Sequence, residues 1–133
     1  MSNAVKIKSV ALSISEWALR LLLAAVFVYA GMQKFPSDPG AMWVKVFDDI
    51  GIGQWFRYFT GIVEVVGGCL VAAPRATSIA VPLLACTMVG AFLVHLTVVG
   101  TGPQTIAVSV LLAALLAVWL LHRRRSAGVA DRT

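Results

Sequence analysis

The apolar residues of this chain gather into four long runs, separated by short segments rich in proline, glycine and charge. A helix needs roughly 20 mostly apolar residues to cross the hydrocarbon core of a bilayer. The runs predict crossings at about residues 14–33, 55–73, 78–99 and 104–121. The pattern therefore predicts an all-α fold, an integral membrane four-helix bundle that occupies residues 1–133 as a single domain.

The segment at residues 41–54 mixes apolar and charged side chains and predicts a short interfacial helix. Its aromatic residues, and those that follow, are interpreted as a belt at headgroup level. The alternative is a lid over an outer pocket. The aromatic residues of this belt or lid are Trp43, Trp55, Phe56, Tyr58 and Phe59. Asp48 and Asp49 are expected on a solvated helix face, and no metal site is predicted.

Composition supports a membrane protein and excludes a conventional soluble enzyme. Apolar residues make up 59% of the chain and charged residues 13%, whereas soluble domains have roughly 45–50% and about 25%. The net charge of +5 does not indicate nucleic acid, because the basic residues mark the ends of apolar runs and form no stripe with aromatic side chains. The predicted partner is the lipid bilayer.

The basic residues also predict the orientation. An even number of crossings places both termini on one side, together with Lys6, Lys8, Arg75, Arg123, Arg124, Arg125 and Arg132. The opposite loops carry Lys34, Lys45 and Arg57, offset by three aspartates. Because basic loops are retained in the cytoplasm, we expect a multi-pass protein with both termini cytoplasmic.

The alternative interpretation of the first apolar run is a cleaved signal peptide. Lys6 and Lys8 would supply its basic region, and Val28-Tyr29-Ala30 fits a small-residue cleavage pattern. Arg20 interrupts the run, and the apolar residues lead directly into Lys34. These two features favour a membrane crossing.

Each predicted crossing has a face of small and polar residues. Positions separated by about 4, 7, 11 and 14 return to nearly the same side of an α-helix. The faces are Arg20, Ala24, Phe27, Gly31 and Lys34; Gly61, Glu64 and Gly68 beside Gly67; Thr87, Ala91 and His95; and Thr105, Ser109 and Ala113. We expect all of them to face a common interior. Cys69 and Cys86 share no CxxC spacing and are expected to be buried as small apolar side chains.

Depth divides the ionisable residues into two groups. Lys34, Glu64 and His95 are predicted near the outer end of the bundle, where they can converge. Arg20 lies about 21 Å from Lys34 along the helix axis, in an inner group with Glu16 or the Arg75 turn. Two structural alternatives stay open: Lys34 and Glu64 only hold two helices in register, and His95 only bonds a carbonyl oxygen.

Residues 20–23, 30–35, 60–68, 74–75 and 90–95 carry a family resemblance. Over roughly Trp17 to Leu121 the chain resembles the DoxX family of small bacterial membrane proteins. The more specific matches are Arg20, Lys34 and the Gly61, Glu64, Gly67, Gly68 group. The resemblance implies a four-crossing bundle in the bacterial inner membrane. It also implies a link to quinone or thiol redox chemistry, since relatives are named for a subunit of a thiosulfate:quinone oxidoreductase.

The leading hypothesis is a redox-associated subunit of a quinone-linked oxidoreductase that binds a quinone-like lipophilic ligand in an outer-half pocket. Lys34, Gln33 and Arg20 would bind the ligand, and Glu64 and His95 would be the catalytic, proton-relaying pair. No covalent cofactor is expected. The alternative is a non-catalytic membrane assembly or stress-response partner protein. A proton-coupled transporter is disfavoured because four helices without inverted repeats leave little room for alternating access. A redox protein partner and a homo-oligomer are left open.

Overall fold

The computed structural model describes residues 2–130, and this part of the chain is helical, with no strands. The helices are α1 (Asn3–Met32), α2 (Met42–Ile50), α3 (Gln54–Ala72), the 3-10 turn η1 (Pro74–Ala76), α4 (Thr77–Val94), the π-helix η2 (His95–Val99) and α5 (Pro103–Ala130). Four helical spans are long and apolar enough to cross a membrane, which confirms the predicted all-α membrane fold. Arg132, counted in the charge argument, lies outside the described residues.

The first and last helices are longer than the apolar runs predict. α1 begins at Asn3 instead of about residue 14, and α5 continues to Ala130 instead of ending near residue 121. Neither extension contains a proline, so nothing in the backbone stops the helix where the apolar run stops. The 30 residues of α1 rise about 45 Å, against a hydrocarbon core of about 30 Å. Both helices therefore extend past the hydrophobic layer.

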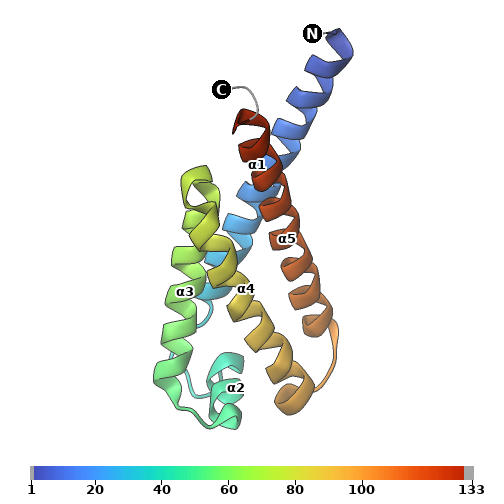
Figure 1. Ribbon diagram of the computed structural model, residues 1–133. Helices are drawn as coiled ribbons and strands as arrows, with labels where there is room; N and C mark the ends of the chain where they lie inside the picture. Colours follow the sequence, from blue (N-terminus) through green and yellow to red (C-terminus); the bar gives the residue numbers. More distant parts are fainter. Residues whose placement is uncertain (1, 131–133) are drawn as a thin grey trace.

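α1 packs most extensively against α3, and α4 packs against both α3 and α5 (Figure 1). The beginning of α1 and the end of α5 lie at the same end of the bundle, while α2 and the α4–α5 connection lie at the other end (Figure 1). We call these the terminal end and the α2 end. The arrangement is the one that an even number of crossings requires.

Glycines bring α1 and α3 into close contact. A Cβ atom on Gly31 would lie 2.7 Å from the carbonyl oxygen of Gly61 and 3.0 Å from the backbone nitrogen of Val65. A Cβ atom on Gly68 would lie 3.0 Å from Cβ of Phe27. Small residues permit this approach, which helices in a membrane use for packing. The predicted close packing of this face is therefore confirmed, with Gly61 and Gly68 against α1 and Gly67 against Leu84 of α4.

Replacing Gly31 with alanine is expected to destabilise the protein by about 1–3 kcal/mol, because the added methyl group would overlap the backbone of α3 and force the helices apart. Thermal unfolding in detergent measures the loss. Gly90→Ala is the matched control, since a Cβ atom on Gly90 meets nothing within 4 Å. Equal melting temperatures for the two variants would contradict the close approach.

The buried core differs from the prediction in the fourth crossing. α5 buries Leu115 and Val118 against Leu23, Phe27 and Leu84, whereas Ser109 and Ala113 of the predicted stripe are exposed. Large apolar side chains bury more surface than small ones, so they define the inner face of a helix that has no glycine contact. The expected inward position of the Thr105, Ser109, Ala113 stripe was wrong.

The prediction for the cysteines was also wrong. Cys69 and Cys86 are free thiols with exposed side chains on the outside of the bundle. In a membrane-spanning helix an exposed apolar side chain faces lipid, so a small apolar residue is tolerated at an outward position as well as at an inward one.

Candidate functional site

Lys34 and Glu64 form an ion pair at the junction of α1 and α3. Lys34 follows the end of α1, and its Nζ donates a hydrogen bond to Oε2 of Glu64 in the middle of α3. Both residues are buried, with 5% and 3% of their surface exposed. Gly31 and Gly61 lie one turn before them, so the close helix contact positions the pair. The structure thus brings together two of the three residues predicted to converge.

The short helix α2 covers this pair. The Nζ atom of Lys34 lies 4.4 Å from the ring centroid of Trp43, a cation–π contact. Gln54 holds α2 in place, since its Nε2 donates to the carbonyl oxygen of Val44 at 2.9 Å and to Oδ1 of Asp48 at 2.6 Å. Phe47 also holds α2 against the bundle, because its side chain is buried, with 5% of its surface exposed. α2 therefore covers the ion pair, while the alternative of a lid over an outer pocket stays a prediction.

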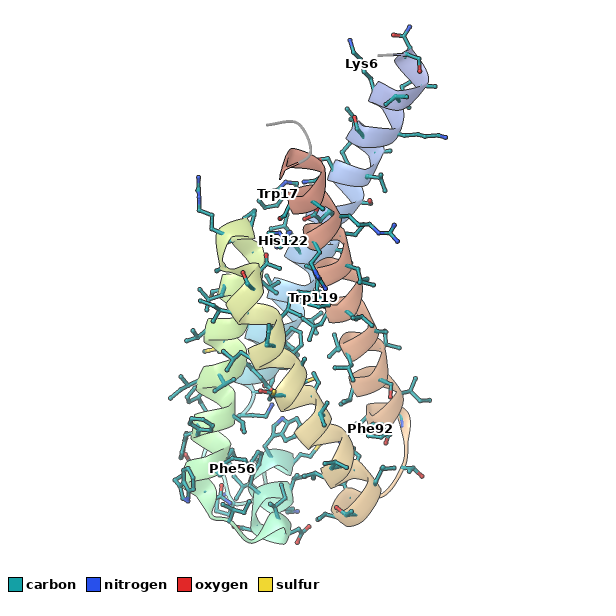
Figure 2. All side chains as sticks on the ribbon, in the orientation of Figure 1. Lys6, Trp17, Phe56, Phe92, Trp119 and His122 are labelled. Carbon is teal, nitrogen blue, oxygen red and sulfur yellow. The ribbon has the colours of Figure 1, made fainter. Side chains whose placement is uncertain are left out.

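The aromatic side chains of α3 divide between two environments. Trp55 and Phe59 are more than half exposed, as a belt at the membrane surface requires. Phe56 packs edge-on against Phe47 of α2, with ring centroids 5.9 Å apart, and Figure 2 places it at the α2 end. The belt and the cover are therefore built from neighbouring residues of one cluster.

Arg57 is a buried residue of this site that the sequence argument placed in an outer loop. It lies in the first turn of α3 with 2% of its surface exposed. Its Nη1 donates to the carbonyl oxygens of Lys34 and, at 2.8 Å, of Pro36, and its Nε donates to Oε1 of Gln54 at 2.6 Å. Arg57 thereby satisfies carbonyl groups that follow the end of α1. The sequence does contain a sign that Arg57 is buried. It lies seven residues before Glu64, and that spacing places both residues on one helical face.

His95 does not join the ion pair. It begins the π-helix η2, and its Nδ1 lies 2.7 Å from the carbonyl oxygen of Ala91 in the preceding turn. A carbonyl oxygen only accepts hydrogen bonds, so Nδ1 carries the proton and Nε2 of a neutral ring is an acceptor. Among the described residues, no hydrogen bond connects His95 to Lys34 or Glu64. The structure therefore agrees with the alternative in which His95 bonds a carbonyl oxygen. The π-helix η2 that contains His95 also contacts α2, the helix that covers the ion pair.

The other two predicted ligand-binding residues lie apart from the pair. Gln33 caps the end of α1 and its side chain is exposed. Arg20 belongs to a separate cluster near the terminal end, where its Nε and Nη2 donate to Oε1 of Glu16 at 3.0 and 2.8 Å. The roles assigned to both residues in ligand binding stay predictions.

The Arg20 cluster joins all four crossings. Nη1 of Arg20 donates to the carbonyl oxygen of Val71 at 3.0 Å and to Oγ1 of Thr77 at 2.7 Å, at the α3–α4 turn. Glu16 also accepts a hydrogen bond from Nε of Arg125 on α5, at 2.9 Å. Of the two partners considered for Arg20, Glu16 is the one it contacts, and Arg75 is exposed. This arrangement ties the ends of the four crossings together.

Two apolar grooves lie on the outer surface of the bundle. The α4–α5 groove has a volume of about 450 Å³. The α1–α3 groove has a volume of about 670 Å³ and is lined by residues that include Val28, Tyr29 and Cys69. Lys34, Glu64 and His95 line neither groove. Within residues 2–130, no group of three or more His, Cys, Asp or Glu side chains is arranged to hold a metal ion.

A family model described as DoxX matches residues 17–97. The chain belongs to the DoxX family. The matched region contains the outer pair with Arg57, and it also contains Glu16's partner Arg20 at the terminal end. The family assignment thus covers both buried clusters except for Glu16 and Arg125.

A curated relative of this DoxX protein comes from Bacillus subtilis (strain 168) and is named "Putative oxidoreductase CatD". It is 32% identical over 75 residues, which are 56% of this chain and 54% of the relative. The matched part therefore covers about half the length of the curated relative. No solved structure matches the chain.

Proposed function

We propose that this DoxX-family protein is a redox-associated subunit of the bacterial inner membrane that binds a quinone-like lipophilic ligand beside Lys34 and Glu64. The observation that carries the proposal is the buried ion pair under α2. A charged side chain within a membrane costs about 2.5–3.5 kcal/mol even on insertion scales, and such residues commonly serve function. The name of the Bacillus subtilis relative, which describes an oxidoreductase, supports a redox role.

The residues beside the pair suit a small oxygen-bearing head group. Lys34 Nζ has three donor hydrogens, and Glu64 is its one side-chain hydrogen-bond partner among the described residues. A quinone supplies two-electron chemistry coupled to protons, and Glu64 would hold or release such a proton. Because α2 covers the pair, binding requires α2 to move, and the bonds from Gln54 to Val44 and Asp48 are the contacts that must open.

Quinone extraction and binding test this proposal. The protein, purified in mild detergent, is extracted with organic solvent and assayed for quinone, and it is then titrated with decylubiquinone while tryptophan fluorescence is followed. We expect near-stoichiometric quinone and saturable quenching, since Trp43 lies against Lys34. Lys34→Met should weaken binding about tenfold or more, the contribution of a hydrogen bond to a charged group. Lys45→Met, on the exposed side of α2, is the matched control.

The role of His95 is tested in the same titration. If His95 takes part through its free Nε2, His95→Gln weakens binding while His122→Gln, at the terminal end, does not (Figure 2). An intact helical fold with no quinone and no saturable binding would favour the alternative function, a non-catalytic assembly or stress-response partner. In that case the ion pair serves only to join α1 and α3.

We also propose that the terminal end is cytoplasmic. Lys6 and His122 lie at this end (Figure 2), as does the basic run that follows Leu121. A reporter active only in the cytoplasm is expected to work when fused after Thr133, and one active only outside is expected to work when inserted near Ser37. The reverse pattern would move the ion pair to the cytoplasmic half and contradict the charge argument.

A further inference from the structure

The α4–α5 groove lies on the outer surface of the bundle, and neither Lys34 nor Glu64 lines it. α4 contributes Ala85 and Phe92, and α5 contributes a row from Ser109 to Trp119. This row extends about 15 Å along α5. Figure 2 shows Phe92 toward the α2 end of the groove and Trp119 nearer the terminal end. The groove therefore runs along the direction in which lipid chains lie in a bilayer.

The lining of the groove suits an aliphatic chain. Ser109 supplies the one hydroxyl group among the lining residues, and its Oγ already donates to the carbonyl oxygen of Thr105 at 2.9 Å. The small side chains of Ala85 and Ala113 leave the space between the two helices unfilled. The hydroxyl group of Ser109 therefore needs no partner from the occupant, and an apolar occupant leaves it satisfied.

A positive charge stands at one end of this groove. Arg123 is one turn beyond Trp119 on the same face of α5, and its guanidinium lies 4.8 Å from the centroid of the Trp119 ring. Arg123 is exposed, whereas Arg125 is bonded to Glu16. The apolar groove and the cation are therefore continuous, in the order in which a phospholipid presents its chain and its phosphate.

We propose that the α4–α5 groove binds an acyl chain of an anionic phospholipid whose phosphate contacts Arg123. A second copy of this chain fits the groove less well. A helix is about 10–12 Å across, too wide to enter a groove of about 450 Å³ that is spread along eleven residues of α5. Two parallel copies facing each other there would also oppose their basic runs, Arg123 to Arg125. This inference is independent of the proposed quinone site.

Lipid retention tests the inference. The full chain is reconstituted in nanodiscs of equal phosphatidylglycerol and phosphatidylcholine, re-extracted in mild detergent, and its co-purifying lipids are quantified by mass spectrometry. Both leaflets have the same composition, so the result does not depend on orientation. We expect phosphatidylglycerol to be enriched, and Arg123→Gln to lower the enrichment about fivefold, the effect of one basic residue near a lipid surface. Arg124→Gln removes the same charge one residue away and should keep most of the enrichment.

A second pair of variants tests the groove itself. Ala113→Phe fills the groove and is expected to abolish the enrichment, whereas Ala107→Phe adds the same ring to an exposed position of α5 outside the lining. Equal enrichment in wild type and Arg123→Gln would overturn the proposal. So would an equal loss in Arg124→Gln, which would indicate general attraction to a basic surface, or full retention in Ala113→Phe. Circular dichroism of each variant confirms that the helices are intact.

Discussion

Replacing Glu64 with glutamine is expected to destabilise the protein by about 3 kcal/mol, near the low end of what breaking a buried ion pair costs. The change leaves the Lys34 ammonium buried between the Trp43 ring and a neutral amide, with no carboxylate to balance its charge. The flexible lysine stem can recover part of the loss by extending toward the α2 end, which keeps the effect near the low end of the range. Unfolding in detergent, by heat or denaturant, measures it.

The double variant Glu64→Gln, Lys34→Met is expected to be more stable than the Glu64→Gln single variant, because removing both charges removes the desolvation penalty. Lys45→Met, an exposed lysine of α2, should have almost no effect and serves as the control. If the double variant is no more stable than the less stable of the two single variants, Glu64→Gln and Lys34→Met, the two residues do not stabilise each other. In a complementation assay the double variant should stay inactive. Full activity there would show that the pair is scaffolding.

Replacing Arg20 with methionine should destabilise the protein by about 3–5 kcal/mol. The substitution removes the main partner of buried Glu16 and the donor to the Val71 carbonyl and the Thr77 hydroxyl. Arg125 still bonds Glu16, but its side chain is 46% exposed and compensates weakly. Arg20→Lys should recover only part of the loss, because an ammonium group does not reproduce the planar fork that reaches three elements.

The measurement for Arg20 is the unfolding transition in detergent, with Arg124→Met as the control. Arg124 is also in the basic region of the terminal end, but it is exposed. Similar stabilities for Arg20→Met and Arg124→Met would mean that the inner cluster does not hold the α3–α4 turn against α1. Quinone binding by an Arg20 variant that still folds tests the predicted ligand role of Arg20, and unchanged binding would contradict that role.

Part of the candidate site could be predicted from residue spacing. Lys34 and Glu64 were expected to meet, because each lies on the small-residue face of its helix at a similar depth. The α1 stripe is inward as predicted, with Arg20, Phe27, Gly31 and Lys34 all buried. Helical periodicity and the cost of charge in lipid determine such faces without any knowledge of the neighbouring helices.

The contacts that close the site could not be predicted in this way. The spacing of Arg57 from Glu64 is that of a buried residue, but its place at the start of a crossing is typical of an exposed loop charge. Arg57 is buried because the backbone after α1 brings the carbonyl oxygens of Lys34 and Pro36 to its guanidinium. Trp43 covers Lys34 because the hydrogen bond from Gln54 to the carbonyl oxygen of Val44 holds α2 against the start of α3. Both depend on residues that are distant in the sequence, so no local pattern contains them.

The sequence by itself determined the membrane class, the four crossings, the family and the polar faces of the first two helices, because each of these follows from apolar length, local periodicity or motif. The tertiary structure decided which face of α5 is inward, where α1 and α5 end, that His95 bonds its own helix and that α2 seals the ion pair. The physical reason is that lipid accepts any apolar face. Hydrophobicity therefore identifies a crossing, but close packing and hydrogen-bond partners orient it.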